Sequence, residues 1–121
     1  MNTSEINKKI MGLESVTGLP VSPDVYTGDK TSYIVFSWVT TDPEYFGDDH
    51  PLYDVNKLNV ILYSPMKKNT STIKKTIRDY LEREGFSVGP IWGPNPAQVG
   101  DSSKSEWNLQ TVFEAEYTDQ H

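Results

Sequence analysis

The stretch Leu58–Ser64, LNVILYS, has leucine or valine at every second position. A repeat of two is the period of a β-strand, in which successive side chains point to opposite faces. A second stretch, Tyr33–Val39 or YIVFSWV, is rich in β-branched and aromatic residues and is apolar on both faces. Such a strand suits either the centre of a sheet covered on both sides or a position at an interface. We expect the two strands to pair as a long hairpin.

The segment between these strands, Glu44–Asp54 or EYFGDDHPLYD, is expected to interrupt them as a loop at or near the tip of the hairpin. It holds four carboxylates, one of the two histidines of the chain and three aromatic rings, with a proline and a glycine. Two kinds of site are compatible with this composition. The carboxylates indicate a metal or catalytic site, and the aromatic rings indicate a surface that contacts another protein.

A divalent metal is bound by several carboxylate oxygens, and a histidine nitrogen suits a transition metal. Asp48, Asp49, His50 and Asp54 supply these groups, but their spacing matches neither a calcium-binding loop nor a helical histidine pair. A solvated acidic loop accounts for the same residues. We therefore expect no metal and no cofactor, with a small metal-dependent enzyme that uses this loop as the alternative.

Catalytic motifs of other kinds are absent from the sequence. The chain has no cysteine, which excludes thiolate catalysis and cysteine zinc sites. It also has no Gly-x-Ser-x-Gly motif, and the glycines of residues 89–100 stand among prolines, which lack the N–H groups that a phosphate-binding loop needs. We expect the protein not to be an enzyme.

Aromatic side chains rimmed by charges are typical of protein interfaces. The hairpin segment has this pattern, and we predict a partner-binding surface there that consists of Tyr45, Phe46, Asp48, Asp49, Leu52 and Tyr53. The apolar members of this set can instead fold back to cover the sheet of the hairpin itself. Trp38 and Trp92 are expected in the core.

A helix is predicted from Ser71 to Glu84, because apolar residues recur there at the spacing of helical turns. These residues are Ile73, Ile77, Tyr80 and Leu81. Gly85 is expected to end this helix in the left-handed conformation, with Phe86 folding back onto its last turn. A first helix is predicted to begin at Thr3 or Ser4 and to end near Gly18, followed by an extended connection over 18–30.

Two more strands are predicted after the second helix. A short one lies around 86–92, a Gly- and Pro-rich loop follows over 93–105, and a long strand with one polar face covers 106–117. The expected order is therefore α-β-β-α-β-β. We expect an α+β fold in which residues 1–121 form a single domain, with a mostly antiparallel sheet and two helices packed on one face.

Charge and hydropathy restrict the partners. The formal net charge is −6, from 11 basic and 17 acidic residues, so the protein as a whole repels nucleic acid phosphates. A local exception is the basic cluster Lys67, Lys68, Lys74, Lys75 and Arg78, which either meets a phosphate or an acidic partner or is a solvated helix face. No apolar run suits a signal peptide or a membrane span, so we expect synthesis and retention in a cytoplasm.

Four segments of the chain resemble a family of bacteriophage proteins. They are INKKIMGLESVTGLPVSPDVYTGDKTSYIVFSW (6–38), LNVILYSP (58–65), TIKKTIRDYLEREGF (72–86) and TVFEAEYTD (111–119). In amino-acid sequence and element order they are similar to the tail terminator, or tail completion, proteins of phages and prophages of Gram-positive bacteria. The segment 91–105, IWGPNPAQVGDSSKS, departs from that pattern, and no residue role is transferred there.

The resemblance implies a structural virion protein of the tail or neck, assembled in the cytoplasm of the bacterial host. Such proteins form a ring, typically a hexamer, at the head-proximal end of the tail tube, where they stop tube growth and join the tail to the head connector. The implied partners are copies of the same chain, the tail tube protein and the connector proteins, with no membrane. An acidic ring would let DNA pass without specific binding. Another neck component, such as a head-completion or connector protein, is the alternative.

Overall fold

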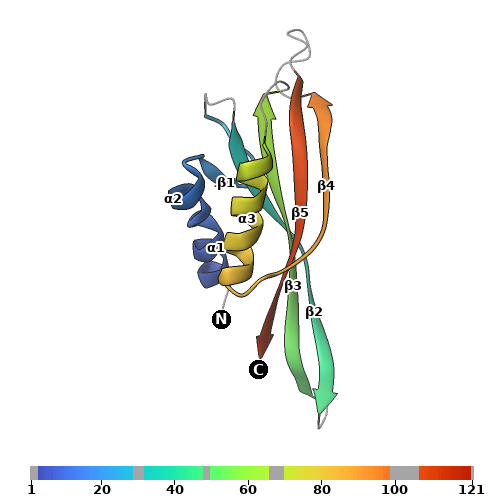
Figure 1. Cartoon of the computed structure of the whole chain (residues 1–121). Helices are drawn as coiled ribbons and strands as arrows, with labels where there is room; N and C mark the ends of the chain where they lie inside the picture. Colours follow the sequence, from blue (N-terminus) through green and yellow to red (C-terminus); the bar gives the residue numbers. More distant parts are fainter. Residues whose placement is uncertain (1–2, 29–31, 48–49, 66–69, 99–106, 121) are drawn as a thin grey trace.

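A five-stranded sheet in the order β1-β2-β3-β5-β4 forms the centre of the protein. The computed structural model describes residues 3–28, 32–47, 50–65, 70–98 and 107–120. The strands are β1 (Val21–Pro23), β2 (Tyr33–Gly47), β3 (His50–Pro65), β4 (Ser87–Gln98) and β5 (Trp107–Gln120). All neighbouring strands are antiparallel except β1 and β2, which are parallel. Helices lie on one face of the sheet only (Figure 1), as the α+β prediction requires.

The predicted hairpin exists and is longer than predicted. β2 and β3 pair from Tyr33 opposite Tyr63 to Gly47 opposite His50, so most of the Glu44–Asp54 segment is strand and only its tip is a connection. The prediction of a loop that interrupts the strands was therefore wrong. Pairing continues because β5 supports β3 from the other side as far as Tyr53 opposite Gln120. The hydrogen-bond ladder with β5 stabilises β3, although the acidic residues and the proline of this segment have a low strand propensity.

β4 also extends further than predicted, through residues that were assigned to the Gly- and Pro-rich loop. Its prolines are tolerated because β4 is the last strand of the sheet, where one row of N–H groups has no ladder to join. The register shifts between Val88 and Ile91 and again between Trp92 and Asn95. These irregularities are β-bulges, which bend an edge strand away from its neighbour.

The predicted extended connection over 18–30 contains a short strand that sequence reasoning missed. β1 pairs with Ile34–Phe36 of β2, and the N–H of Ile34 donates to the carbonyl of Pro20 at 2.8 Å. Two prolines within four residues concealed this strand. A sheet edge needs only one row of backbone groups, so the prolines do not prevent pairing.

The first predicted helix is divided into α1 (Thr3–Met11) and α2 (Leu13–Thr17) at Gly12. The second is α3 (Ser71–Arg83), and it ends as predicted. Gly85 has φ +98°, its N–H donates to the carbonyl of Glu82, and the N–H of Phe86 donates to that of Leu81. This pair of bonds is the Schellman motif, in which a glycine ends the helix and an apolar residue folds back onto it.

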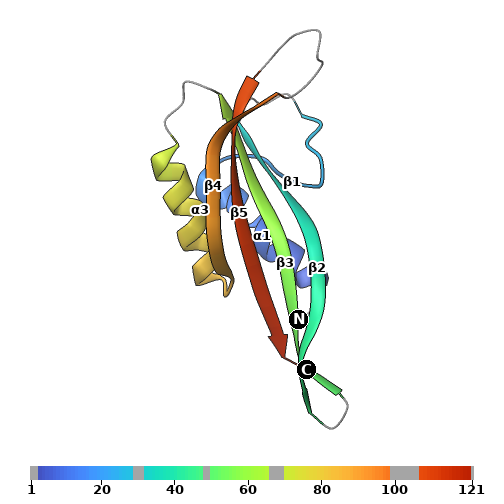
Figure 2. The same ribbon diagram turned by 90° about the vertical axis from the view of Figure 1, so that its right-hand side faces the viewer.

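The core lies between the three helices and the sheet. Figure 2, seen from the side of the sheet, shows the helices behind the strands. Its buried members on the helices include Ile6, Ile10, Leu13, Ile77 and Leu81. Those on the strands include Ile34, Phe36, Leu58, Val60, Leu62 and Phe113. The stripe predicted for α3 faces this core, because Ile77 and Leu81 are fully buried and Ile73 packs against the cluster. The prediction that this face of α3 packs against the sheet is thus confirmed.

Tyr80 joins α3 to α1, and ionisation of its phenol at alkaline pH removes part of the stability of the fold. Its hydroxyl donates to the carbonyl of Lys9 at 2.7 Å, close to Gly12, where a β-carbon would collide with the phenol. Burial raises the pKa of Tyr80, and the Glu84 carboxylate adds to the effect. Because the folded pKa exceeds the unfolded value, this contribution is complete below about pH 10 and is lost as the pH rises through the folded pKa.

We expect Tyr80→Phe to lower the free energy of unfolding by about 1 kcal/mol at neutral pH, the usual contribution of one hydrogen bond. The variant should also lose less stability above about pH 10 than the parent, because it lacks this ionisable phenol. Urea unfolding at several pH values measures both effects. The same alkaline decline in the two proteins would contradict the role assigned to Tyr80.

Candidate assembly surface

The face of the sheet opposite the helices carries a continuous apolar row. Val35 lies opposite Ile61, Ile61 opposite Val112, and Val112 opposite Trp92. Facing residues of neighbouring strands hold their side chains in contact distance. The row therefore crosses four strands on a face that no described helix covers.

Stacked tyrosines flank this row toward β1. The rings of Tyr26 and Tyr33 are 4.3 Å apart and those of Tyr33 and Tyr63 are 5.0 Å apart, both in stacked orientation. Burial raises the pKa of Tyr33, and the neighbouring phenols of Tyr63 and Tyr26 add to the increase. The tyrosines thus shelter one end of the uncovered face.

The other end of the row is open to solvent, because Trp92 is 56% exposed. Val39 of β2, outside the row, is 57% exposed. The prediction that Trp92 lies in the core was therefore wrong, because the bulge before it turns its side chain to the helix-free face. Trp38 packs against the core as predicted, and its indole N–H donates to the side-chain oxygen of Asn7 at 2.9 Å. The two tryptophans differ because they lie on opposite faces of the sheet.

A groove of about 420 Å³ lies on the same face and is lined by Glu114, the hydrogen-bond partner of Trp92. Its lining includes Val39, Lys57, Pro90, Glu114 and Glu116. Gly89 and Pro90, which line the groove, lie at the register shift between Val88 and Ile91, where the ladder of β4 and β5 is interrupted. Sequence reasoning missed it, although a Gly-Pro pair inside a predicted strand is a signal for such a bulge.

Two carboxylates and one ammonium group set the charge of the groove. Lys57 lies directly opposite Glu116 in the ladder of β3 and β5. Glu114 accepts a hydrogen bond from the indole N–H of Trp92 at 3.1 Å. The groove surface, which we define as Trp92, Glu114 and Glu116, therefore combines an exposed aromatic ring with acidic groups.

The hairpin residues predicted to bind a partner lie on the far half of β2 and β3. Tyr45 and Phe46 belong to β2, and Leu52 and Tyr53 belong to β3. Asp48 and Asp49 lie outside the described residues, as do the side chains of 42–53. The backbone register brings the two apolar pairs to the same part of the hairpin. Figure 1 shows this part, the hairpin arm, extending beyond the helices.

The expectation that the hairpin binds no metal stays a prediction. Within the described side chains, no group of three or more histidine, aspartate or glutamate residues is placed to hold a metal ion. The candidates Asp48, Asp49 and His50 are not among these side chains. In the described part of the chain, no helix has the length and apolar content that crossing a bilayer requires.

Comparisons with known proteins do not assign the chain to a family. No protein-family model matches the chain, and no curated protein matches it. A solved structure without a functional name is 14% identical, with a TM-score of 0.49 over 100% of this chain and 98% of that chain. At that similarity the structure supports no argument about function.

Proposed function

We propose that this chain is a structural virion protein that forms a ring at the head-proximal end of a phage tail tube. The ring, a hexamer in this proposal, ends tube growth and joins the tail to the head connector. Its partners are copies of itself, the tail tube protein and the connector proteins. The protein acts in the tail or neck of the virion, has no enzymatic activity, and assembles in the bacterial cytoplasm.

The observation that supports this proposal best is the uncovered face of the sheet. An antiparallel sheet with one wet face normally places polar residues there. Here Ile61, Val112 and Trp92 form part of an apolar row, and Trp92 is more than half exposed. Exposed apolar surface beside charged groups marks a site of protein contact.

The hairpin arm supports the proposal in a second way. β1 pairs with β2 only at Ile34–Phe36, so no described strand covers the outer edge of the arm. Open strand edges offer backbone donors and acceptors to a partner. The acidic net charge of −6 suits a conduit that DNA crosses without being bound.

Removing the aromatic rings of the arm tests the proposal. In a phage that lacks this gene, we expect Tyr45→Ala with Phe46→Ala to abolish complementation. Interface aromatics carry a large share of contact energy, about 2 kcal/mol or more each at a hot spot. Folding should persist, since these residues lie on the arm beyond the helices. Plaque counts, electron microscopy of particles and thermal melts of the purified variant are the measurements.

The matched control is Met11→Ala with Val16→Ala, which removes exposed apolar side chains from α1 and from α2. We expect it to complement fully. Tails of irregular length in the absence of the protein would support a terminator, whereas tails of normal length that fail to join heads would favour another neck component. Normal infectious yield from the Tyr45, Phe46 double variant would refute the assembly role of the arm.

A further inference from the structure

The first half of α3 carries three cations without an acidic counterpart in its first turn. Lys74, Lys75 and Arg78 line a hollow of about 210 Å³ together with Ser71 and Ile91. Lys74 and Arg78 are one helical turn apart, as are Lys75 and Arg78, so their charges repel. We call these three cations the basic surface.

The position of Lys74 in the first turn of α3 adds to this cost. The amino-terminal end of a helix has a positive partial charge, which favours acidic side chains there. The first turn of α3 has none. Arg78 approaches Asp79 with 3.9 Å between Nε and Oδ1, but the two side chains are 46% and 54% exposed, and such a pair contributes little. An external acidic partner would relieve both the repulsion among the three cations and the unfavourable interaction of Lys74 with the helix dipole.

The groove surface has the complementary character. Glu114 and Glu116 are exposed, Glu114 is hydrogen-bonded to Trp92, and these two carboxylates outnumber the single ammonium group of Lys57 in the groove lining. Opposite charges on two surfaces direct which faces meet and exclude wrong pairings. Trp92 supplies the kind of aromatic anchor around which such contacts form.

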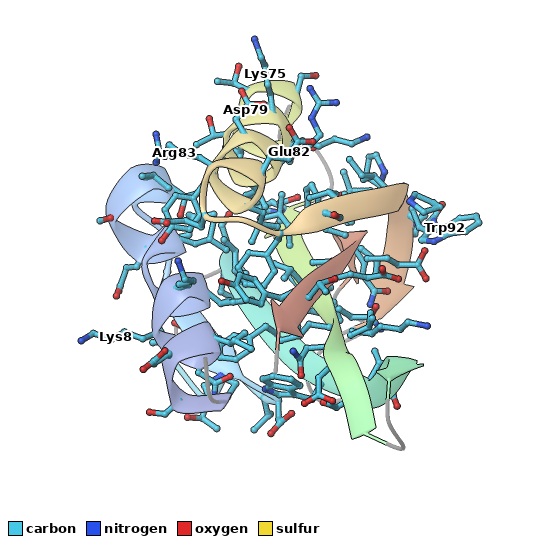
Figure 3. The ribbon with its side chains drawn as sticks, turned by 90° about the horizontal axis from the view of Figure 1, so that it is seen from below. Lys8, Lys75, Asp79, Glu82, Arg83 and Trp92 are labelled. Atoms are coloured by element: carbon cyan, nitrogen blue, oxygen red, sulfur yellow. The ribbon has the colours of Figure 1, made fainter. Side chains whose placement is uncertain are left out.

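The two surfaces cannot meet within one chain. The basic surface lies on the helix side of β4, next to Ile91, whereas Trp92 and Glu114 lie on the other face of the sheet. Figure 3 shows Lys75 and Trp92 projecting in different directions, one from α3 and the other from β4. Surfaces that complement each other but face apart on one molecule make head-to-tail contacts, and these close into a ring when the rotation fits.

We infer that the basic surface on α3 of one copy packs against the groove surface of the next copy in the ring. This inference rests on the proposed ring and names the faces that build it. Each copy uses both surfaces, so every uncovered sheet face in a closed ring is covered by a neighbouring helix.

Charge reversal tests the contact. Lys75→Glu places a carboxylate opposite Glu116, and Glu116→Lys places an ammonium group opposite Lys75. We expect each single variant to need about tenfold or more protein than the parent to form rings, measured by native mass spectrometry and sedimentation. Thermal melts identify any variant that fails to fold. Lys8→Glu, on the outer side of α1 (Figure 3), is the matched control and should assemble like the parent.

Mixing the two single variants gives the sharpest result. In a ring that alternates them, every contact pairs either Lys75 with Glu116 or the two reversed charges, so the mixture should assemble at protein concentrations at which neither variant does so alone. The doubly reversed chain should also assemble. A mixture that stays monomeric, or single variants that assemble like the parent, would overturn the inference while the ring itself stands.

A covalent probe gives a second measurement, because the chain contains no cysteine. Lys75→Cys with Glu116→Cys in one chain should give a ladder of disulfide-linked multimers under oxidising conditions, and each single cysteine variant should stop at dimers. Absence of the ladder from a sample that forms rings would refute the contact. A parent protein that is monomeric at every concentration would refute the ring, and with it both the proposed function and this inference.

Discussion

Ile77→Asp is expected to lower the free energy of unfolding and the melting temperature more than any surface substitution on the same helix. Ile77 is fully buried on α3, where it packs within the core cluster between helices and sheet. An aspartate there buries either a carboxylate without a partner or a protonated acid in a site shaped for a hydrocarbon. The cost is about 3–5 kcal/mol, a large share of the roughly 5–15 kcal/mol that stabilises a small domain. Thermal melts by circular dichroism measure it.

Lys75→Asp is the control for this prediction. It introduces the same side chain two residues away on the same helix, at an exposed position. We expect its melting temperature to stay within a few degrees of the parent, measured at a concentration where both proteins are monomeric. If Lys75→Asp were the more damaging substitution, the assignment of the buried face of α3 would be wrong.

Gly93→Ala is expected to be the most damaging conservative change in β4. Gly93 has φ +97°, and a β-carbon there would overlap the carbonyl oxygen of Gln110 and lie 2.9 Å from the backbone nitrogen of Asn95. Both obstacles are backbone atoms, so the strand must shift rather than a side chain turn away. Strain and overpacking together cost about 2–5 kcal/mol. Urea unfolding measures the change, and the fluorescence of nearby Trp92 should report the displacement of β4.

Gly18→Ala separates the cost of the left-handed backbone conformation from the cost of the steric overlap. Gly18 also has positive φ, +72°, but a β-carbon there meets no atom within 4 Å. We expect a cost of about 1 kcal/mol from the left-handed conformation alone. Equal losses in the two variants would show that the close approach of Gln110 to Gly93 does not matter. The prediction would then fail even though the conformational argument holds.

Short sequence patterns were sufficient to predict the helices and strands that depend only on interactions within a short segment. The alternation in Leu58–Ser64 predicted a strand, and the apolar stripe with Gly85 predicted both the buried face of α3 and its end. These features depend on the period of the side chains and on backbone angles, which a short segment determines by itself. The proposed partner surface on the hairpin came from composition and stays a prediction.

Contacts between segments far apart in the chain decided the remaining features. The sequence alone determined the fold class, the pairing of the first two long strands and the core face of α3. Only the tertiary structure extended the hairpin through Tyr45 and Phe46, added β1, and placed Trp92 on the uncovered face. A strand is stabilised by neighbours that its own residues do not reveal, and a bulge in an edge strand determines to which face a side chain points.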